Sequence, residues 1–400
     1  MKFIHAGDIH LGNPFLGLRN LPNWVQNIVQ DAGNTAFRRL IADAIAEQVD
    51  FVLLPGDLFN SNEVDAQIEL TVLKAFDELR AASIPVFLSF GNHDYLASKR
   101  ADFPWPSNVH LFDESVTTMQ LTTKAGESVA ISGFSYGQQH IETAMIDQFP
   151  VKQTGSKYHL GMYHGELGRA GSGNYAPFAL TALNEKHYDY WALGHIHLRQ
   201  TLQMKPFIGY SGNLQGLNKN ESGDKGYYLV TDQNGQLIPT FVAVAPIIWT
   251  EEELEIPMNL ATNELVAYIR KSIQGDSENF SLINLRIISD DARVLSLIAN
   301  GQLQAQLAQS SQTRDPWYIW QISLKELQKT VQLPHLPADA WDNNITEIFT
   351  LDNMQAAGLK QVHDPELLDE FLNDEKLTEI MDMVKVKLQL LGKDVSSDEN

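Results

Sequence analysis

The sequence contains no cysteine and no long uninterrupted apolar run. The lack of cysteine excludes disulfide bonds and thiolate ligands, so a metal ion bound to this chain would be held by His, Asp, Glu or Asn. No apolar segment approaches the roughly 20 residues that a membrane-spanning helix needs. The N-terminus, MKFIHAGD, leads straight into polar residues and not into the apolar stretch of a signal peptide. We therefore expect a cytoplasmic protein with no membrane partner.

Basic residues are also scarce, with 29 Lys and Arg against 50 Asp and Glu and a net charge of −21. Because Lys and Arg supply most of the non-specific affinity for nucleic acid, this balance argues at first against a nucleic-acid partner. However, residues 339–400 carry nearly half of the net negative charge. Several acids of the first half belong to a candidate metal site, where bound cations would offset them. The overall charge therefore leaves the partner open.

The length of 400 residues suits two or three units. In residues 1–245, the short apolar runs in FIHAGD, FVLLPGD and PVFLSFGNHD alternate with helical patterns at about 34–48, capped by Asn34, and 65–82. This alternation predicts a layered α/β domain. Further strands are predicted at 129–134, 159–163, 188–193, 207–210 and 227–231. Together they predict a two-layer β-sandwich core flanked by helices.

The remaining chain divides into two parts. Residues 246–338 predict a small α+β domain, with a helix at about 261–273 and strands in FSLINLRIIS and WYIWQISL. Residues 339–400 are acidic and predict a C-terminal helical tail, whose apolar stripe runs from Leu368 to Leu391. The stripe is consistent either with packing on its own domain or with docking to helices of a partner.

The residues that suggest chemistry come directly after predicted strands. Asp8 and His10 follow the first strand, and residues two apart on an extended segment face the same way, so both can reach one ion. Asp57 follows Gly56 at the end of a second apolar run. Each of these signals is weak alone, because an Asp-x-His pair is usually a solvated strand end and Gly-Asp is usually a turn.

The segment Gly-Asn-His-Asp after the third strand is more specific. Asn92 offers a neutral amide oxygen to a cation, and His93 offers a proton or a positive charge. Asp94 can accept a hydrogen bond from that imidazole and fix its tautomer. The alternative is a polar turn after a strand. We predict His93 and Asp94 as the catalytic residues.

Histidines follow two of the later strands. His164 precedes a glycine in MYHGE and is, alone, typical of a structural histidine. His195 and His197 form the segment GHIH, and two histidines on one face of a strand end have few purely structural roles. Because five such motifs occur at the carboxyl ends of predicted strands, a shared metal site is favoured over five unrelated turns. His5 and His159 lie inside apolar segments and are predicted to be core histidines.

The motifs GDIHLG, LLPGDLFN, GNHD, YHGE and GHIH resemble those of the calcineurin-like metallophosphoesterases. Other segments, including NPFLGL, FSYGQQH, GRAGSGNYAPF and GNLQG, resemble DNA-repair nucleases of the SbcD type, and among these the YhaO branch. The likeness covers most of residues 1–245 and is loose beyond them. The metal motifs alone indicate the superfamily, and the other segments indicate the branch.

The resemblance implies a site for two divalent metal ions, in the first place Mn²⁺, with Fe²⁺, Mg²⁺ and Zn²⁺ as alternatives. It implies that one ion is held by Asp8, His10, Asp57 and His197, and the other by Asp57, Asn92, His164 and His195. It also implies that residues 246–338 form a capping domain that helps to select DNA. The resemblance implies two kinds of partner: an SMC-like ATPase subunit that binds the C-terminal helices, and a second copy of the chain in a homodimer. It also implies a bacterial cytoplasmic location.

Three functions compete at this point. The first is a DNA nuclease, a 3′–5′ exonuclease or endonuclease that hydrolyses double-stranded ends or single strands in DNA double-strand break repair. The second is a phosphodiesterase or phosphatase for small molecules. The third is a regulatory or scaffolding subunit of an ATPase complex. The implied capping domain and helical tail favour the nuclease.

Overall fold

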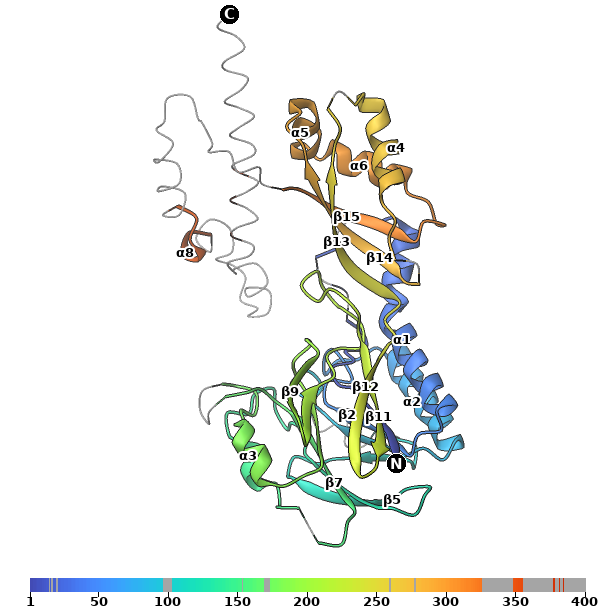
Figure 1. Ribbon diagram of the computed structural model, residues 1–400, viewed down its shortest axis with the longest axis vertical. Coiled ribbons are helices and arrows are strands. Elements are labelled where there is room, and N and C mark those ends of the chain that lie inside the picture. Colours follow the sequence, from blue (N-terminus) through green and yellow to red (C-terminus); the bar gives the residue numbers. More distant parts are fainter. Residues whose placement is uncertain are drawn as a thin grey trace, which may run out of the picture. The chain divides into compact units, whose positions relative to one another are not determined.

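The computed structural model describes residues 1–325 apart from 14, 16, 19–20, 96–102, 153, 169–172, 259 and 277, and also 348–354, 377, 381 and 384. The chain forms two compact units (Figure 1). The first contains Met1–Thr250 and Asp276–Leu282, and the second contains Glu251–Gly275 and the described residues from Ile283 onward. Within these described residues, no helix is both long and apolar enough to cross a membrane.

The first unit is built on two six-stranded sheets. In the first sheet the strands run in the order β12–β11–β1–β2–β3–β4. Neighbours from β1 to β4 are parallel, whereas β11 is antiparallel to both β1 and β12. The bounds are β1 Lys2–His5, β2 Phe51–Pro55, β3 Val86–Ser89, β4 Val109–Leu111, β11 Gly226–Gln233 and β12 Gln236–Ala243.

The second sheet has the order β5–β6–β7–β8–β10–β9. Its central strands β6, β7, β8 and β10 are parallel, and the edge strands β5 and β9 are antiparallel to their neighbours. The bounds are β5 Thr117–Thr122, β6 Ser128–Gly133, β7 Tyr158–His164, β8 Tyr190–Gly194, β9 Gln200–Met204 and β10 Phe207–Tyr210.

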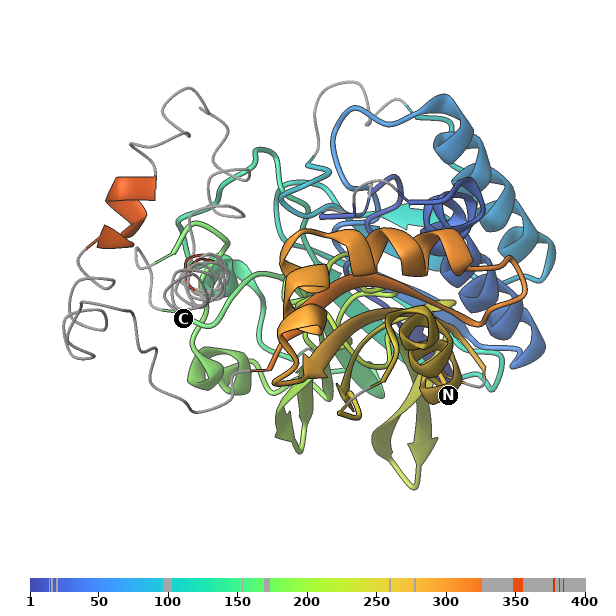
Figure 2. The same cartoon turned by 90° about the horizontal axis from the view of Figure 1, so that it is seen from above.

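The central strands are buried on both faces, which explains their nearly continuous apolar sequences. Phe51 and Leu53 of β2 pack between the two sheets, against residues such as Leu160 and Tyr190. The alternate residues of β2 point to the other face and pack under the helices α1 Asn23–Ala46 and α2 Ala66–Ala81, which lie side by side (Figures 1 and 2).

A third apolar cluster covers the outer face of the second sheet. It includes Trp191 and Tyr163 from the strands and Leu183 from the short helix α3 Leu180–Glu185, next to the 3₁₀ helix η1 Met145–Gln148. The first unit is therefore a sandwich of two sheets with helices outside each, as the sequence predicts.

The start of α1 differs from the prediction. The helix begins at Asn23, and Asn34 lies in its interior instead of capping it. The reason is that Val25, Val29 and Ala32 are buried and extend the apolar face of the helix by three turns toward the N-terminus. By contrast, α2 lies where the sequence predicts a helix, and Asp65 caps it, because its carboxylate accepts a hydrogen bond from the backbone N–H of Gln67 at 2.7 Å.

The second unit contains most of a three-stranded sheet in the order β13–β14–β15, whose strands β13 and β14 begin in residues of the first unit. Apolar residues of the helices, such as Ile269 and Leu307, form one core with Leu285 and Ile319 of the strands, and the helices lie beside the sheet (Figure 2). The bounds are β13 Ile247–Glu255, β14 Phe280–Ile288, β15 Trp317–Leu324, α4 Thr262–Ser272, α5 Ala292–Ala299, α6 Gln302–Ser310 and α8 Leu351–Met354.

The functional division of the chain stays a prediction. The proposed roles of 246–338 as a capping domain and of 339–400 as a docking segment are not decided by where the compact units begin and end. Most of 339–400, including most of the stripe from Leu368 to Leu391, lies outside the described residues.

The two predicted core histidines, His5 and His159, are fully buried. The ring of His5 contacts the hydroxyl of Tyr190 at 3.0 Å and the carbonyl of Leu193 at 3.1 Å. Burial lowers the pKa of His5 from 6.5 to about 4. A folded-state pKa below the unfolded value means that the contribution of this group to stability is fully present above about pH 6.5 and is lost as the pH falls toward 4.

We therefore predict that His5→Gln reduces the acid sensitivity of the fold. Between pH 7.5 and pH 5, the free energy of unfolding of the wild type should fall by about 2 kcal/mol more than that of the variant, because glutamine does not titrate. Urea unfolding at the two pH values measures this difference. His140→Gln, at an exposed position, is the matched control. Equal losses in the wild type and in His5→Gln would contradict the prediction.

Candidate metal centre

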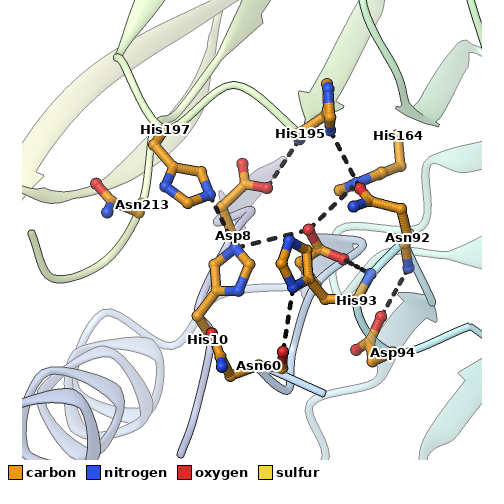
Figure 3. A network of polar contacts seen from close by, with 12 residues as sticks. Asp8, His10, Asn60, Asn92, His93, Asp94, His164, His195, His197 and Asn213 are labelled. Atoms are coloured by element: carbon orange, nitrogen blue, oxygen red, sulfur yellow. Dashed lines mark hydrogen bonds and ion pairs between the residues drawn. The ribbon is translucent and has the colours of Figure 1, made fainter. Parts of the chain in front are cut away.

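All nine predicted site residues lie together at the carboxyl ends of parallel strands, and Figure 3 labels them apart from Asp57. The first sheet contributes the loops after β1, β2 and β3, and the second sheet contributes the end of β7 and the loop after β8. Ligands of α/β proteins gather at such edges because the loops of neighbouring parallel strands converge there. The residues are Asp8, His10, Asp57, Asn92, His93, Asp94, His164, His195 and His197.

Four of these side chains are presented by backbone in the left-handed region. Asp8, His10, Asp57 and His195 have φ values of 52°, 49°, 53° and 102°. The prediction that Asp8 and His10 share one face of an extended strand is therefore wrong, because β1 ends at His5 and both residues have positive φ. Such conformations cost about 1–3 kcal/mol each for residues other than glycine and cluster at functional sites.

The carboxylate of Asp57 lies at the middle of the cluster. Its Oδ2 is 3.6 Å from Nε2 of His10 and 3.4 Å from Nε2 of His164. Its Oδ1 accepts a hydrogen bond from the backbone N–H of His93 at 3.0 Å. One carboxylate oxygen thus faces an imidazole from each of the two sheets.

Three side chains meet on one side of Asp57. Oδ1 of Asn92 is 2.9 Å from Nε2 of His164 and 3.1 Å from Nδ1 of His195. The other ring nitrogen of His164 is 3.0 Å from the carbonyl oxygen of Pro55. A proton on Nδ1 of His164 satisfies that carbonyl, so Nε2 is left to face the oxygens of Asn92 and Asp57.

Asp8, His10 and His197 meet on the other side. Nε2 of His10 is 2.9 Å from Nε2 of His197. Oδ1 of Asp8 accepts the backbone N–H of His195 at 2.8 Å, whereas its buried Oδ2 has no hydrogen-bond partner among the described residues. Ligand atoms of Asp8, His10 and His197 lie within 4.8 Å of one another.

The pKa values in the cluster indicate that its buried carboxylates need more positive charge nearby. Burial alone would raise the pKa of Asp57, but the imidazoles of His164 and His10 outweigh it and hold the pKa well below the usual range. Burial raises the pKa of Asp8 to about 6, despite nearby histidines. Burial would lower the pKa of His164, but the charge of Asp57 outweighs it and raises the value to about 9. In the protein alone, a proton on His164 provides the charge that these carboxylates need.

The atoms that face inward are almost all acceptors. They are carboxylate oxygens, an amide oxygen and imidazole nitrogens, and the N–H groups of His164 and His197 can be directed outward to Pro55 and Glu221. Oxygen and nitrogen ligand atoms without sulfur suit hard or borderline divalent cations. This set of ligand atoms therefore fits a pair of such cations on either side of Asp57.

Comparison with known proteins agrees with this geometry. The calcineurin-like phosphoesterase family matches residues 1–199. The chain carries a calcineurin-like phosphoesterase domain. Family members hold two divalent metal ions, so the Asp and His cluster has the composition that the family requires.

Several curated proteins are similar over this domain. The metallophosphoesterase YhaO of Bacillus subtilis is 37% identical over 259 residues, which are 64% of this chain and 63% of YhaO. The DNA double-strand break repair protein Mre11 of Methanocaldococcus jannaschii is 27% identical, over 58% of this chain and 62% of that protein. The protein of the same name from Thermoplasma acidophilum is 25% identical, over 72% and 77%. The chain thus spans less than two thirds of the first two relatives.

Within the phosphoesterase domain, the contacts of His93 and Asp94 differ from the predicted ones. Nδ1 of His93 lies 3.1 Å from the carbonyl oxygen of Asn60, which makes the orienting contact that the sequence assigned to Asp94. The carboxylate of Asp94 is buried and accepts backbone N–H groups of Gly91 at 2.7 Å and Phe59 at 3.1 Å. Gly91 belongs to the loop that carries His93 and Phe59 to the loop after β2, so the carboxylate of Asp94 ties these two loops together.

Sequence reasoning missed three residues that support the phosphoesterase site. Asn60 supplies the carbonyl beside His93. Glu221 accepts a hydrogen bond from Nδ1 of His197 at 2.7 Å, and Asn213 donates to Glu221 at 2.6 Å. Burial would raise the pKa of Glu221, but its bond with His197 outweighs burial and lowers the value. Asn213 lies in the segment GNLQG, whereas no sequence signal marks Glu221.

Glycine at position 91 allows the loops of the two sheets to approach each other at the site. A Cβ at Gly91 would overlap the carboxylate of Asp57 and lie 2.6 Å from the ring of His164. We predict that Gly91→Ala lowers the affinity of the domain for Mn²⁺ by roughly tenfold or more, as changes around metal ligands do. Isothermal titration of the metal-free protein measures this affinity.

Gly33→Ala is the matched control for Gly91→Ala. Gly33 lies in α1, and a Cβ there would meet no atom within 4 Å. This variant should bind Mn²⁺ as the wild type does. Unchanged binding by Gly91→Ala would show that the cluster does not need this close approach.

Proposed function

We propose that this protein is a dinuclear metal-dependent phosphodiesterase that hydrolyses the backbone of DNA. The observation that carries the proposal is the cluster of inward-facing acceptor atoms around the buried carboxylate of Asp57, in a calcineurin-like phosphoesterase domain. Two of the similar proteins are named DNA double-strand break repair proteins, which supports DNA as the substrate and break repair as the setting.

In this proposal the ions share Asp57. One position is formed by Asp8, His10, Asp57 and His197, and the other by Asp57, Asn92, His164 and His195. The distances among these side chains, from 2.9 to 3.6 Å, support this division. Mn²⁺ suits a donor set that mixes carboxylate, amide and imidazole groups and lacks sulfur.

When bound, two such ions supply Lewis acidity and offset the negative charge that develops on a phosphoryl group. His93 is the proposed proton donor. With Nδ1 directed to the carbonyl of Asn60, its ring lies beside the proposed ion positions, because its ligand atom is within 4.8 Å of those of Asp57 and His10. In the imidazolium form both ring nitrogens of His93 carry a proton, so Nδ1–H can remain on the carbonyl of Asn60 while the proton on Nε2 passes to the leaving oxygen. Asp94 acts indirectly, because it holds the loop that carries His93.

The wider assembly is proposed from the sequence. Residues 246–338 act as a capping domain, and the helical segment 339–400 docks to an SMC-like ATPase subunit in the cytoplasm. The docking stripe lies mostly outside the described residues, so it rests on the apolar pattern alone.

The substrate class can be tested directly. We predict that metal-free protein supplied with Mn²⁺ shortens end-labelled duplex or single-stranded DNA stepwise, because two ions beside an imidazole suit phosphodiester cleavage. Gel analysis of the labelled products reports the activity and its polarity. Asp57→Ala is the control, since it removes the shared carboxylate. Hydrolysis of bis-p-nitrophenyl phosphate without cleavage of DNA would favour a small-molecule phosphodiesterase instead.

The role of His93 can be separated from metal binding. We predict that His93→Gln lowers kcat by about 10²–10⁴-fold, the usual contribution of a positioned proton donor. The variant should still bind two Mn²⁺, because His93 is not among the proposed ligands. Steady-state kinetics at saturating Mn²⁺ and isothermal titration give the two readouts. Wild-type turnover in His93→Gln would exclude the role.

A further inference from the structure

The carboxylate of Glu221 lies behind the site, in the loop between β10 and β11. Its side chain is 13% exposed, and its Oε1 accepts a hydrogen bond from Nδ1 of His197 at 2.7 Å. It lies 24 residues after His197 in the chain, and no sequence motif connects it with the proposed ligands. The tertiary fold alone places it against a proposed ligand.

Four donors surround this carboxylate. Besides His197, the side chain of Asn218 donates to Oε1 at 3.1 Å. The side chain of Asn213 and the backbone N–H of Leu217 donate to Oε2 at 2.6 and 2.7 Å. Both oxygens are therefore acceptors, and the surroundings fix the orientation of Glu221 independently of any ion.

The histidines of the two proposed ion positions are thus supported differently. Behind His197 stands a carboxylate, whereas the ring nitrogen of His164 that faces outward contacts the neutral carbonyl of Pro55. A carboxylate behind an imidazole fixes the tautomer and increases the basicity of the nitrogen on the other side of the ring. The two proposed ion positions therefore differ in the group that supports one of their histidines.

We propose that Glu221 is a positioning residue that holds His197 as the Nδ1–H tautomer, so that Nε2 is free to bind the ion shared with Asp8 and His10. This inference rests on the proposed function, because it concerns one of its two ion positions. It predicts that loss of Glu221 weakens that position selectively and leaves the position formed by Asn92, His164 and His195 filled.

Glutamine is the informative replacement for Glu221. Glutamine has the same size as glutamate but only one acceptor oxygen. The surroundings supply hydrogen-bond donors to both side-chain oxygens of Glu221. The backbone N–H of Leu217 cannot turn away, so the amide oxygen is retained on that side and the NH₂ group faces His197. His197 then has to accept at Nδ1 and carries its proton on Nε2, where it blocks the ion.

The test measures metal binding and not turnover. Isothermal titration of metal-free Glu221→Gln with Mn²⁺ should show one site weakened by about 10–100-fold, the usual effect of removing a group that orients a ligand. Anomalous scattering from crystals grown in limiting Mn²⁺ should show the position of Asp8, His10 and His197 depleted and the other one filled. Glu47→Gln, which removes the same charge from an exposed ion pair with Lys2, should bind as the wild type does.

Two outcomes would overturn the proposal. One is unchanged affinity of both sites in Glu221→Gln, and the other is equal loss from both sites. Thermal unfolding of the metal-free variant shows whether it is folded. If it is not, nitrogen-15 shifts of the His197 ring in the metal-free wild type, at a pH at which the ring is neutral, decide the question. The Nδ1–H tautomer supports the proposal, and the Nε2–H tautomer contradicts it.

The wild-type titration separates this inference from the proposed function. If the wild type binds no pair of Mn²⁺ ions, the dinuclear function itself is wrong. If the wild type binds two ions and Glu221→Gln binds both equally well, only the role of Glu221 fails.

Discussion

The structure of the site depends on the buried carboxylate of Asp57. It is 1% exposed, and an unpaired charge at such a place would be strongly destabilising. Its charge is tolerated because His10 and His164 approach it from the two sheets and the backbone N–H of His93 donates to it. The same oxygen atoms are well placed to be shared by two cations. The central requirement of the site is therefore positive charge on both sides of one carboxylate.

The sandwich architecture meets this requirement by bringing loops from both sheets to one edge. Close approach needs glycine at a few positions: a Cβ at Gly56 would overlap the ring of His164, and one at Gly91 would overlap Asp57 as well. It also needs left-handed backbone at several of the proposed ligands, which costs free energy. The extensive apolar cores between and outside the sheets supply the stability that sustains this strain.

The sequence predicted the parts of the site that are tied to strands. A buried strand ends where its apolar run ends, so Asp57 and His164 could each be placed at the carboxyl end of a strand without coordinates. It did not predict Asn60 or Glu221, because each acts through a contact that only the folded loops create. The start of α1 was misplaced for a related reason: whether Asn34 caps a helix depends on whether the residues before it are buried.

The charge of the chain can be reconciled with a substrate that is itself an anion. A net charge of −21 repels a phosphodiester at long range, and the site contributes the carboxylates of Asp8 and Asp57 to that charge. Cations bound among these groups invert the local field, while salt screens the distant acids beyond about 8–10 Å. Substrate binding and metal binding are then linked, because the phosphate is attracted only where the ions are held. On the proposed function, the surroundings of the proposed ligands, including the carboxylate of Glu221, thereby influence the affinity for the substrate as well as for the metal.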